Sequence, residues 1–140
     1  MVREWRIPIE AESPTVSPID EQSPERGQTR ALALEIADIL TDTPASDTRV
    51  MDIATLTPIA DFFVLCSGEN ERQLRAISRE VTDTLASRQR RPQRTEGSAD
   101  SGWILIDYGD VVVHIFAIDQ RSFYRLDELW SEAPTLLAIQ

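Results

Sequence analysis

The apolar pattern is densest in two neighbouring stretches, residues 103–106 and 111–118, where nearly every position is hydrophobic. Both stretches are rich in β-branched and aromatic side chains, which favour strands. The link between them contains Gly109, and glycine can take the positive φ that a tight hairpin needs. Because apolar residues fall on both faces of the pleat, the pattern predicts the two strands of a central hairpin, covered on both sides by helices.

The first half of the chain predicts a helix followed by two strands. A helix is expected from Thr29 to just before Pro44, because its apolar residues recur at i, i+4, i+7 and i+8. Short apolar runs at residues 49–53 and 61–67 predict strands, separated by a Thr-rich turn.

A second helix is predicted to follow Asn70, which can cap it, with Gln73 completing a capping box three residues later. Pro92 ends this helix, and residues 93–96 are a possible short strand. The core-facing stripe of this second helix consists of Leu74, Ile77, Val81 and Leu85. Three arginines occupy the opposite face, Arg72, Arg75 and Arg79. They are either a solvated helix face or a contact for nucleic acid.

After Asp119 the pattern changes to a dense aromatic segment without a clear period. Its five large apolar residues are Phe123, Tyr124, Leu126, Leu129 and Trp130. We expect a short helical turn or irregular segment that either closes the edge of the sheet or forms a partly exposed interaction patch.

These elements predict one α/β domain with a mixed sheet of about five strands, flanked by helices on both faces. Residues 28–140 form this domain, a length that suits a single core. Residues 1–27 hold four prolines, three serines and six acids, so they are expected to be a disordered tail.

The net charge of the chain favours some classes of binding partner over others. The formal net charge is −10, of which the folded part from Gly27 onward carries −7. Free nucleic acid is a poor partner for such a chain, because phosphate binding needs basic patches. A basic protein is a better one, since complementary charge speeds and orients encounter.

Cysteine content and hydropathy indicate the compartment. Cys66 is the only cysteine, so neither an intrachain disulfide nor a cysteine-based metal site is expected. No apolar run approaches the roughly 18 residues of a membrane span, and the N-terminus lacks the apolar core of a secretory signal. We therefore expect a cytoplasmic protein without a cofactor.

Five motifs in order resemble the ribosomal silencing factor, or Iojap, family over residues 29–134. They are D-F-F-V-L-C-S-G at 61–68, the helix start with Arg72, Arg75 and Ile77, Glu96-Gly97, W-I-L-I-D-Y-G-D-V-V-V-H-I-F at 103–116, and R-S-F-Y-R-L-D-E-L-W at 121–130. The resemblance implies a non-catalytic repressor of translation. Its partner would be the fourteenth protein of the large ribosomal subunit, where bound repressor keeps the small subunit from joining.

The resemblance also implies a fold like that of nucleotidyltransferases, without their catalytic motif. Those enzymes use a Gly-Ser loop and an Asp-x-Asp/Glu pair to hold divalent metal. Here Ser67-Gly68 has the reverse order, and a turn separates Asp107 from Asp110. We therefore expect no metal site and no catalysis.

The residues expected to bind the ribosomal protein lie in the hairpin and in the aromatic segment. They are Trp103, Ile104, Asp107, Tyr108, Asp110, Phe123, Tyr124, Asp127, Glu128 and Trp130. Trp103 would be the anchor of the interface, because tryptophan at a patch centre often carries much of the binding energy. The acids would meet arginine or lysine of the partner.

Several residues of the hairpin have a plainer interpretation. Trp103 can be a core aromatic, Asp107 and Asp110 can cap the hairpin turn, and His114 can be a satisfied core histidine. Two other functions also remain open. One is a nucleotidyltransferase-like, metal-dependent enzyme that uses Asp107 and Asp110; the other is a homodimeric adaptor. A peripheral contact with ribosomal RNA through the arginine row is a further possibility.

Overall fold

The computed structural model describes residues 24–120 and 133–139. Among these residues, the two helices described over their full length are α1 (Pro24–Leu40) and α2 (Glu71–Ser87), and η3 (Ala99–Ser101) is a short 3₁₀ turn. Residues 118–120 are also helical. Its strands are β1 (Ser46–Asp52), β2 (Phe62–Gly68), β3 (Arg94–Ser98), β4 (Trp103–Asp107), β5 (Val111–Ala117) and β6 (Thr135–Ile139).

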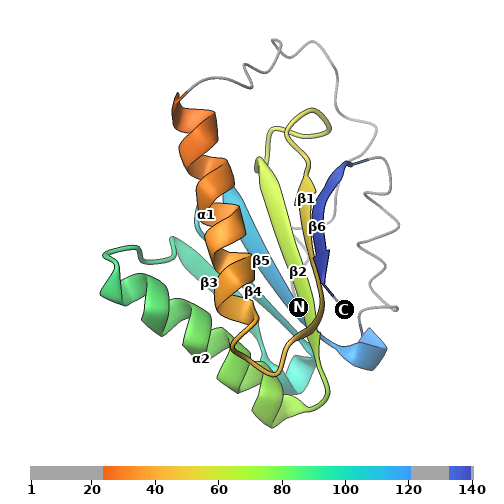
Figure 1. Ribbon diagram of the computed structural model, residues 1–140. Coiled ribbons are helices and arrows are strands. Elements are labelled where there is room, and N and C mark those ends of the chain that lie inside the picture. The colour runs from red at the N-terminus through yellow and green to blue at the C-terminus, as the bar shows by residue number, and fades with distance from the viewer. Residues whose placement is uncertain (1–23, 121–132, 140) are drawn as a thin grey trace.

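The strands form one mixed sheet in the order β3-β4-β5-β2-β1-β6 (Figure 1). β2 and β5 are parallel, while every other neighbouring pair is antiparallel. β4 and β5 form the predicted hairpin, from the pair Trp103–Phe116 to the pair Asp107–Val112. The α/β class with a mixed sheet and flanking helices is therefore confirmed, and the described sheet has six strands rather than about five.

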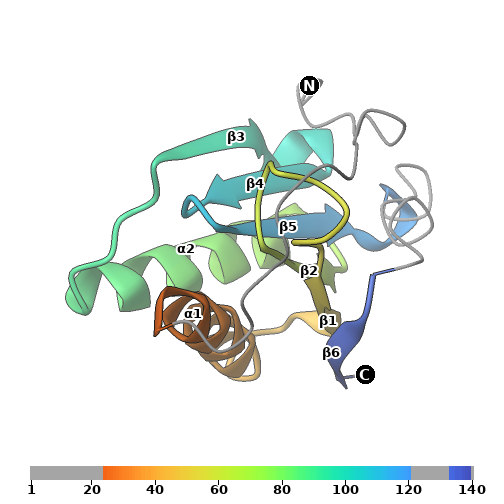
Figure 2. The same cartoon turned by 90° about the horizontal axis from the view of Figure 1, so that it is seen from above.

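Both helices lie on the same face of the sheet (Figure 2). Their apolar stripes, including Ile36 and Ile77, share one core with the inward residues of β2 and β5, such as Val64 and Val113. The prediction of helices on both faces is wrong for the described residues. The connection between β1 and β2 covers the other face instead, where Ile53 and neighbouring apolar residues pack on the sheet.

α2 follows its sequence signals closely. The Asn70 Oδ1 atom accepts a hydrogen bond from the Gln73 backbone N–H at 2.9 Å, and Gln73 Oε1 accepts one from the Glu69 N–H at 2.8 Å. The four residues of the apolar stripe are all buried, which confirms the face that packs on the sheet: Leu74, Ile77, Val81 and Leu85.

α1 begins earlier than predicted, at Pro24, a residue type suited to the first turn of a helix. Its first turn is fastened to the sheet by Arg26, which is buried and ion-paired with Asp52. The Arg26 guanidinium also lies 3.9 Å from Asp61 and 4.9 Å from the centre of the Phe62 ring. Residues 24–27 thus belong to the fold, while residues 1–23 of the predicted tail lie outside the described residues.

Candidate functional site

The turn between β4 and β5 is fixed by Asp107. Its Oδ1 atom accepts a hydrogen bond from the Gly109 backbone N–H at 2.7 Å, and its Oδ2 atom accepts one from Arg94 Nε at 3.2 Å. Gly109 has a φ of +94°, which glycine adopts without steric cost. Asp107 therefore caps the turn, and its carboxylate is already partnered inside the protein.

Asp110 joins the turn to the start of β2 through its backbone and leaves its side chain exposed. The Asp110 carbonyl accepts hydrogen bonds from the N–H groups of Asp61 at 2.8 Å and Phe62 at 3.0 Å. Burial raises the pKa of Asp61, the nearby Asp110 charge raises that pKa further, and Arg26 opposes both effects. The Asp110 carboxylate is thus an exposed acid on a rigid turn.

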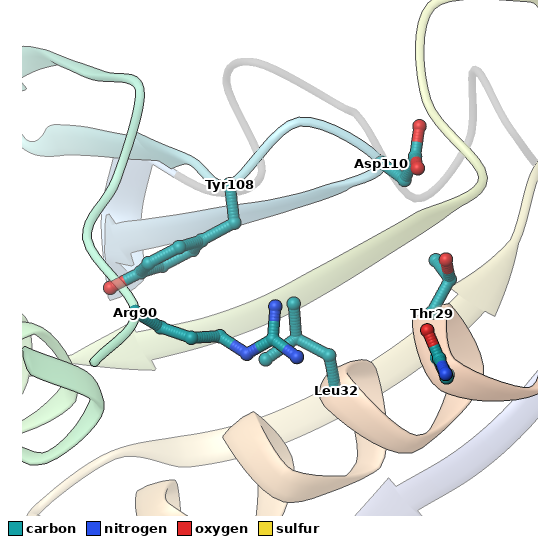
Figure 3. A pocket seen from close by; sticks show the side chains of 6 residues that line it. Thr29, Leu32, Arg90, Tyr108 and Asp110 are labelled. Atoms are coloured by element: carbon teal, nitrogen blue, oxygen red, sulfur yellow. The ribbon is translucent and has the colours of Figure 1, made fainter. Parts of the chain in front are cut away.

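Tyr108 is half-buried, and its hydroxyl oxygen has no hydrogen-bond partner among the described residues. Desolvation raises the pKa of Tyr108 to about 12, so the hydroxyl stays protonated at neutral pH. The ring forms one wall of a cavity of about 120 Å³ (Figure 3). The other residues that line this cavity are Gln28, Thr29, Leu32, Arg90 and Asp110.

Trp103 and Ile104 are buried on opposite faces of the sheet, with only 5 % and 8 % of their surfaces exposed. Ile104 packs in the core beneath the helices, whereas Trp103 packs in the core of the opposite face. The Trp103 Nε1–H donates to His114 Nδ1 at 3.1 Å, and the indole lies 5.0 Å from the Phe116 ring. The structure thus gives Trp103 the environment of a core aromatic and not that of a protruding anchor.

His114 is completely buried, and burial lowers its pKa to about 3. It is neutral at physiological pH, and because its Nδ1 accepts from Trp103, its own N–H is on Nε2. The interpretation as a core histidine fits this geometry. Within residues 24–120 and 133–139, no three His, Cys, Asp or Glu side chains come together in a way that could hold a metal ion.

Five of the predicted binding residues lie outside the described residues: Phe123, Tyr124, Asp127, Glu128 and Trp130. Of the ten predicted, the structure therefore brings Asp107, Tyr108 and Asp110 together at one turn and places Trp103 and Ile104 in the two cores. Among the described helices, none is long and apolar enough to cross a membrane.

Sequence reasoning missed the residues that surround Tyr108. The sequence pattern assigns Thr29 only to the start of a helix and gives Arg90 no role in a binding site, yet both residues line the Tyr108 cavity. No local pattern joins them, because they are distant in sequence and meet only where α1, the loop after α2 and the hairpin turn converge.

Comparison with known proteins points to one family. The family model described as "Ribosomal silencing factor during starvation" matches residues 26–139. The ribosomal silencing factor RsfS of Bacillus subtilis is 39% identical over 93 residues, which cover 66% of this chain and 79% of that protein. The RsfS of Halalkalibacterium halodurans is 39% identical over 95 residues, covering 68% and 81%. A solved structure from Chromobacterium violaceum has a TM-score of 0.70 at 26% identity, over 74% of this chain and 86% of that one.

Proposed function

The chain belongs to the ribosomal silencing factor family, and on this premise we propose that it represses translation by binding the large ribosomal subunit. The bound domain would occupy space that the small subunit needs, so the mechanism is steric and requires no turnover. We propose the fourteenth protein of the large subunit as the direct partner. The relatives are named as silencing factors and not as enzymes, which is consistent with a role without catalysis.

The observation that carries this proposal is the extent of the family match. It runs from residue 26 to residue 139, so it includes all of α1 except its first two residues, all of α2 and the six described strands. Within the described residues, no element is left over that would suggest a second activity.

The proposed contact surface centres on the turn between β4 and β5. Asp110 supplies an exposed carboxylate, and the half-buried Tyr108 supplies an aromatic edge beside it. Both are held on a short, hydrogen-bonded turn, so little conformational entropy is lost when a partner binds. The segment 123–130 stays in the proposal as the second part of this surface.

The sequence suggested Trp103 and Ile104 as contact residues, but we propose a supporting role for both. Because each is less than a tenth exposed, neither offers a partner much contact area. Their packing holds β4 in register with β5, from Trp103–Phe116 to Asp107–Val112, and so fixes the turn at the end of the hairpin. We propose that they support the binding surface from inside.

Charge favours a basic ribosomal protein as the partner. A chain with a net charge of −10 attracts a positively charged surface over a distance of about a Debye length, which is roughly 10 Å at moderate salt. Such attraction raises the association rate more than it raises affinity. We therefore expect association to slow as salt is added.

Sedimentation of purified subunits with and without the full-length protein tests the proposal. We expect the protein to co-sediment with the large subunit and whole ribosomes to decrease. Asp110→Asn removes one charge at the turn, and Asp42→Asn removes one from an exposed position after α1. The first should weaken binding by a few fold, in keeping with the energy of an exposed ion pair of roughly 0.5–1 kcal/mol. The second should not.

If the wild-type protein stayed at the top of the gradient while ribosomes assembled normally, the proposal would be wrong. Equal weakening by both substitutions would show that only overall charge matters and that the turn is not the site. Size measurement over a range of protein concentrations tests the homodimeric alternative in the same samples, because self-association depends on concentration.

A further inference from the structure

A basic surface stands out on this acidic chain. Residues 71–94 contain seven of the fourteen arginines and only three acids, a net charge of +4 against −10 for the whole. Six of these arginines lie on α2 and the loop that follows it, and we call them the α2 basic surface: Arg72, Arg75, Arg79, Arg88, Arg90 and Arg91.

Most of this positive charge is not neutralised within the protein. Arg75 lies 3.7 Å from Glu71, and Arg88 is paired with Glu35, yet both arginines remain more than half exposed. The other four are exposed, and in the described part of the chain none of them forms an ion pair: Arg72, Arg79, Arg90 and Arg91.

The orientation of α2 sets where these charges point. Its apolar stripe is buried against the sheet, so the arginines at i, i+3 and i+7 face away from the protein. Arg72 and Arg79 are separated by about 10 Å along the helix axis. α2 has no aromatic residue, so this face has nothing on which a nucleic-acid base could stack.

The basic surface continues to the proposed ribosomal-protein site. Arg90 follows α2 and lines the same cavity as Tyr108 and Asp110, with its guanidinium group lying between Tyr108 and α1 (Figure 3). When a ribosomal protein occupies the hairpin turn, the part of the subunit surface next to that protein would therefore lie near the arginines.

We propose that the α2 basic surface binds the phosphate backbone of ribosomal RNA beside the protein site. This inference rests on the proposed function, because it needs the domain to be docked on the large subunit. Guanidinium groups bind phosphate oxygens through paired hydrogen bonds, and such contacts position a protein without reading sequence.

The acidity of the rest of the chain fits this arrangement. Outside residues 71–94 the net charge is −14, which repels free RNA and keeps the basic surface from binding it unaided. Once the hairpin turn has docked, the RNA contact becomes intramolecular and its effective concentration is high. The two contacts together restrict the protein to the intact subunit.

The salt dependence of binding tests the inference. The affinity of the full-length protein for purified large subunits is measured between about 50 and 200 mM salt, a range over which counterion release is pronounced. Arg72→Gln/Arg79→Gln removes two unpaired charges and keeps good helix formers. We expect the slope of log affinity against log salt to become shallower by about 1.4 to 1.8, since each lost phosphate contact contributes about 0.7 to 0.9.

Single substitutions supply the matched control. Arg79→Gln and Arg49→Gln each remove one positive charge, but Arg49 pairs in register with Leu65, whose side chain lies in the core on the face away from the helices. Only Arg79→Gln should reduce the slope. Binding to the isolated ribosomal protein should be the same for wild type and both variants.

The outcomes separate this inference from the proposed function. A wild-type protein that binds neither the subunit nor the isolated ribosomal protein refutes the proposed function. Wild-type binding to the subunit, with the double variant unchanged in affinity and slope, refutes the RNA contact alone. Weaker binding with an unchanged slope would also overturn it, because the arginines would then contact protein rather than RNA.

Discussion

Replacing the two partners of the buried Trp103–His114 hydrogen bond, separately and together, tests what holds β4 against β5. His114→Phe keeps a flat ring in a place bounded by Phe63 at 4.6 Å and Phe116 at 6.1 Å, measured between ring centres. It removes the Nδ1 acceptor from the indole N–H. Trp103→Phe removes the donor instead.

The expected magnitudes follow from burial. His114 is 0 % exposed and Trp103 5 %, so water cannot easily replace a lost partner. Leaving a buried polar group without its partner costs about 1–3 kcal/mol, and Trp103→Phe adds the loss of packed ring volume. Removing both partners costs less than the sum of the single changes, with a coupling energy of about 1–2 kcal/mol.

The assay is urea unfolding followed by circular dichroism, on the wild type, the two single variants and the double variant at neutral pH. The free energy of unfolding is obtained from the midpoint and slope of each transition. In a thermal melt, each kcal/mol corresponds to roughly 2–4 °C for a chain of this size. Additive losses in the double variant would show that the hydrogen bond contributes no coupling, and our account of this core would be wrong.

Three further predictions concern other described features. Unfolded histidine binds a proton below pH 6.5 that buried His114, with its pKa of about 3, does not bind, so the free energy of unfolding should fall as pH decreases from 6.5 towards 3. Equilibrium unfolding at several pH values should show this fall in the wild type, and the part of it that comes from His114 should be missing in the His114→Phe variant. Gly97→Ala should lower the free energy of unfolding by about 2 kcal/mol or more. Gly97 has a φ of +79°, and an added Cβ would lie 2.0 Å from the Trp103 carbonyl oxygen. Gly27→Ala in α1, with nothing within 4 Å, should instead raise stability by about 0.5–1 kcal/mol, and one thermal melt compares the two. Tyr108→Phe removes a buried hydroxyl without a described partner and should leave stability unchanged or raise it by about 1 kcal/mol; a loss in urea unfolding would show that the hydroxyl has a bound partner.

Local sequence signals were enough to predict α2 and the hairpin. α2 has a cap at Asn70, an apolar stripe and a stop at Pro92, and these features agree with one another. The hairpin has two apolar runs around Gly109, and its turn needs the positive φ that glycine supplies. Both elements depend on neighbours in sequence, so nothing distant was needed to infer them.

Long-range packing explains what was not predicted. β6 is a short strand whose only described sheet neighbour is β1, nearly ninety residues earlier, and no local period announces that pairing. The sequence also could not show which layer covers the second face of the sheet. Residues 53–61 have apolar side chains without a helical period, so their role as a cover became visible only once Ile53 and Ala60 were placed on the sheet.

In the candidate site, too, local sequence signals predicted some features, while others depended on long-range packing. Turn chemistry made it possible to predict that Asp107 and Gly109 shape the hairpin end. Alternation along β4 put Trp103 and Ile104 on opposite faces but could not say how deeply each would be buried, because that depends on the elements packed above them. The Tyr108 cavity needs three separate segments of the chain and had no signal in any one of them.

The order of strands has a consequence for how this chain folds as it is synthesised. The parallel pair at the centre of the sheet joins Phe62 to Val111, 49 positions later, so β2 has no central partner until β5 has been made. Contacts between such distant residues slow folding, because the intervening chain must be ordered before they form. An incomplete chain therefore exposes the unpaired edge of β2, a strand in which every residue is buried in the finished protein. Such an edge is prone to aggregation, so we expect the nascent chain to depend on protection until β5 has emerged.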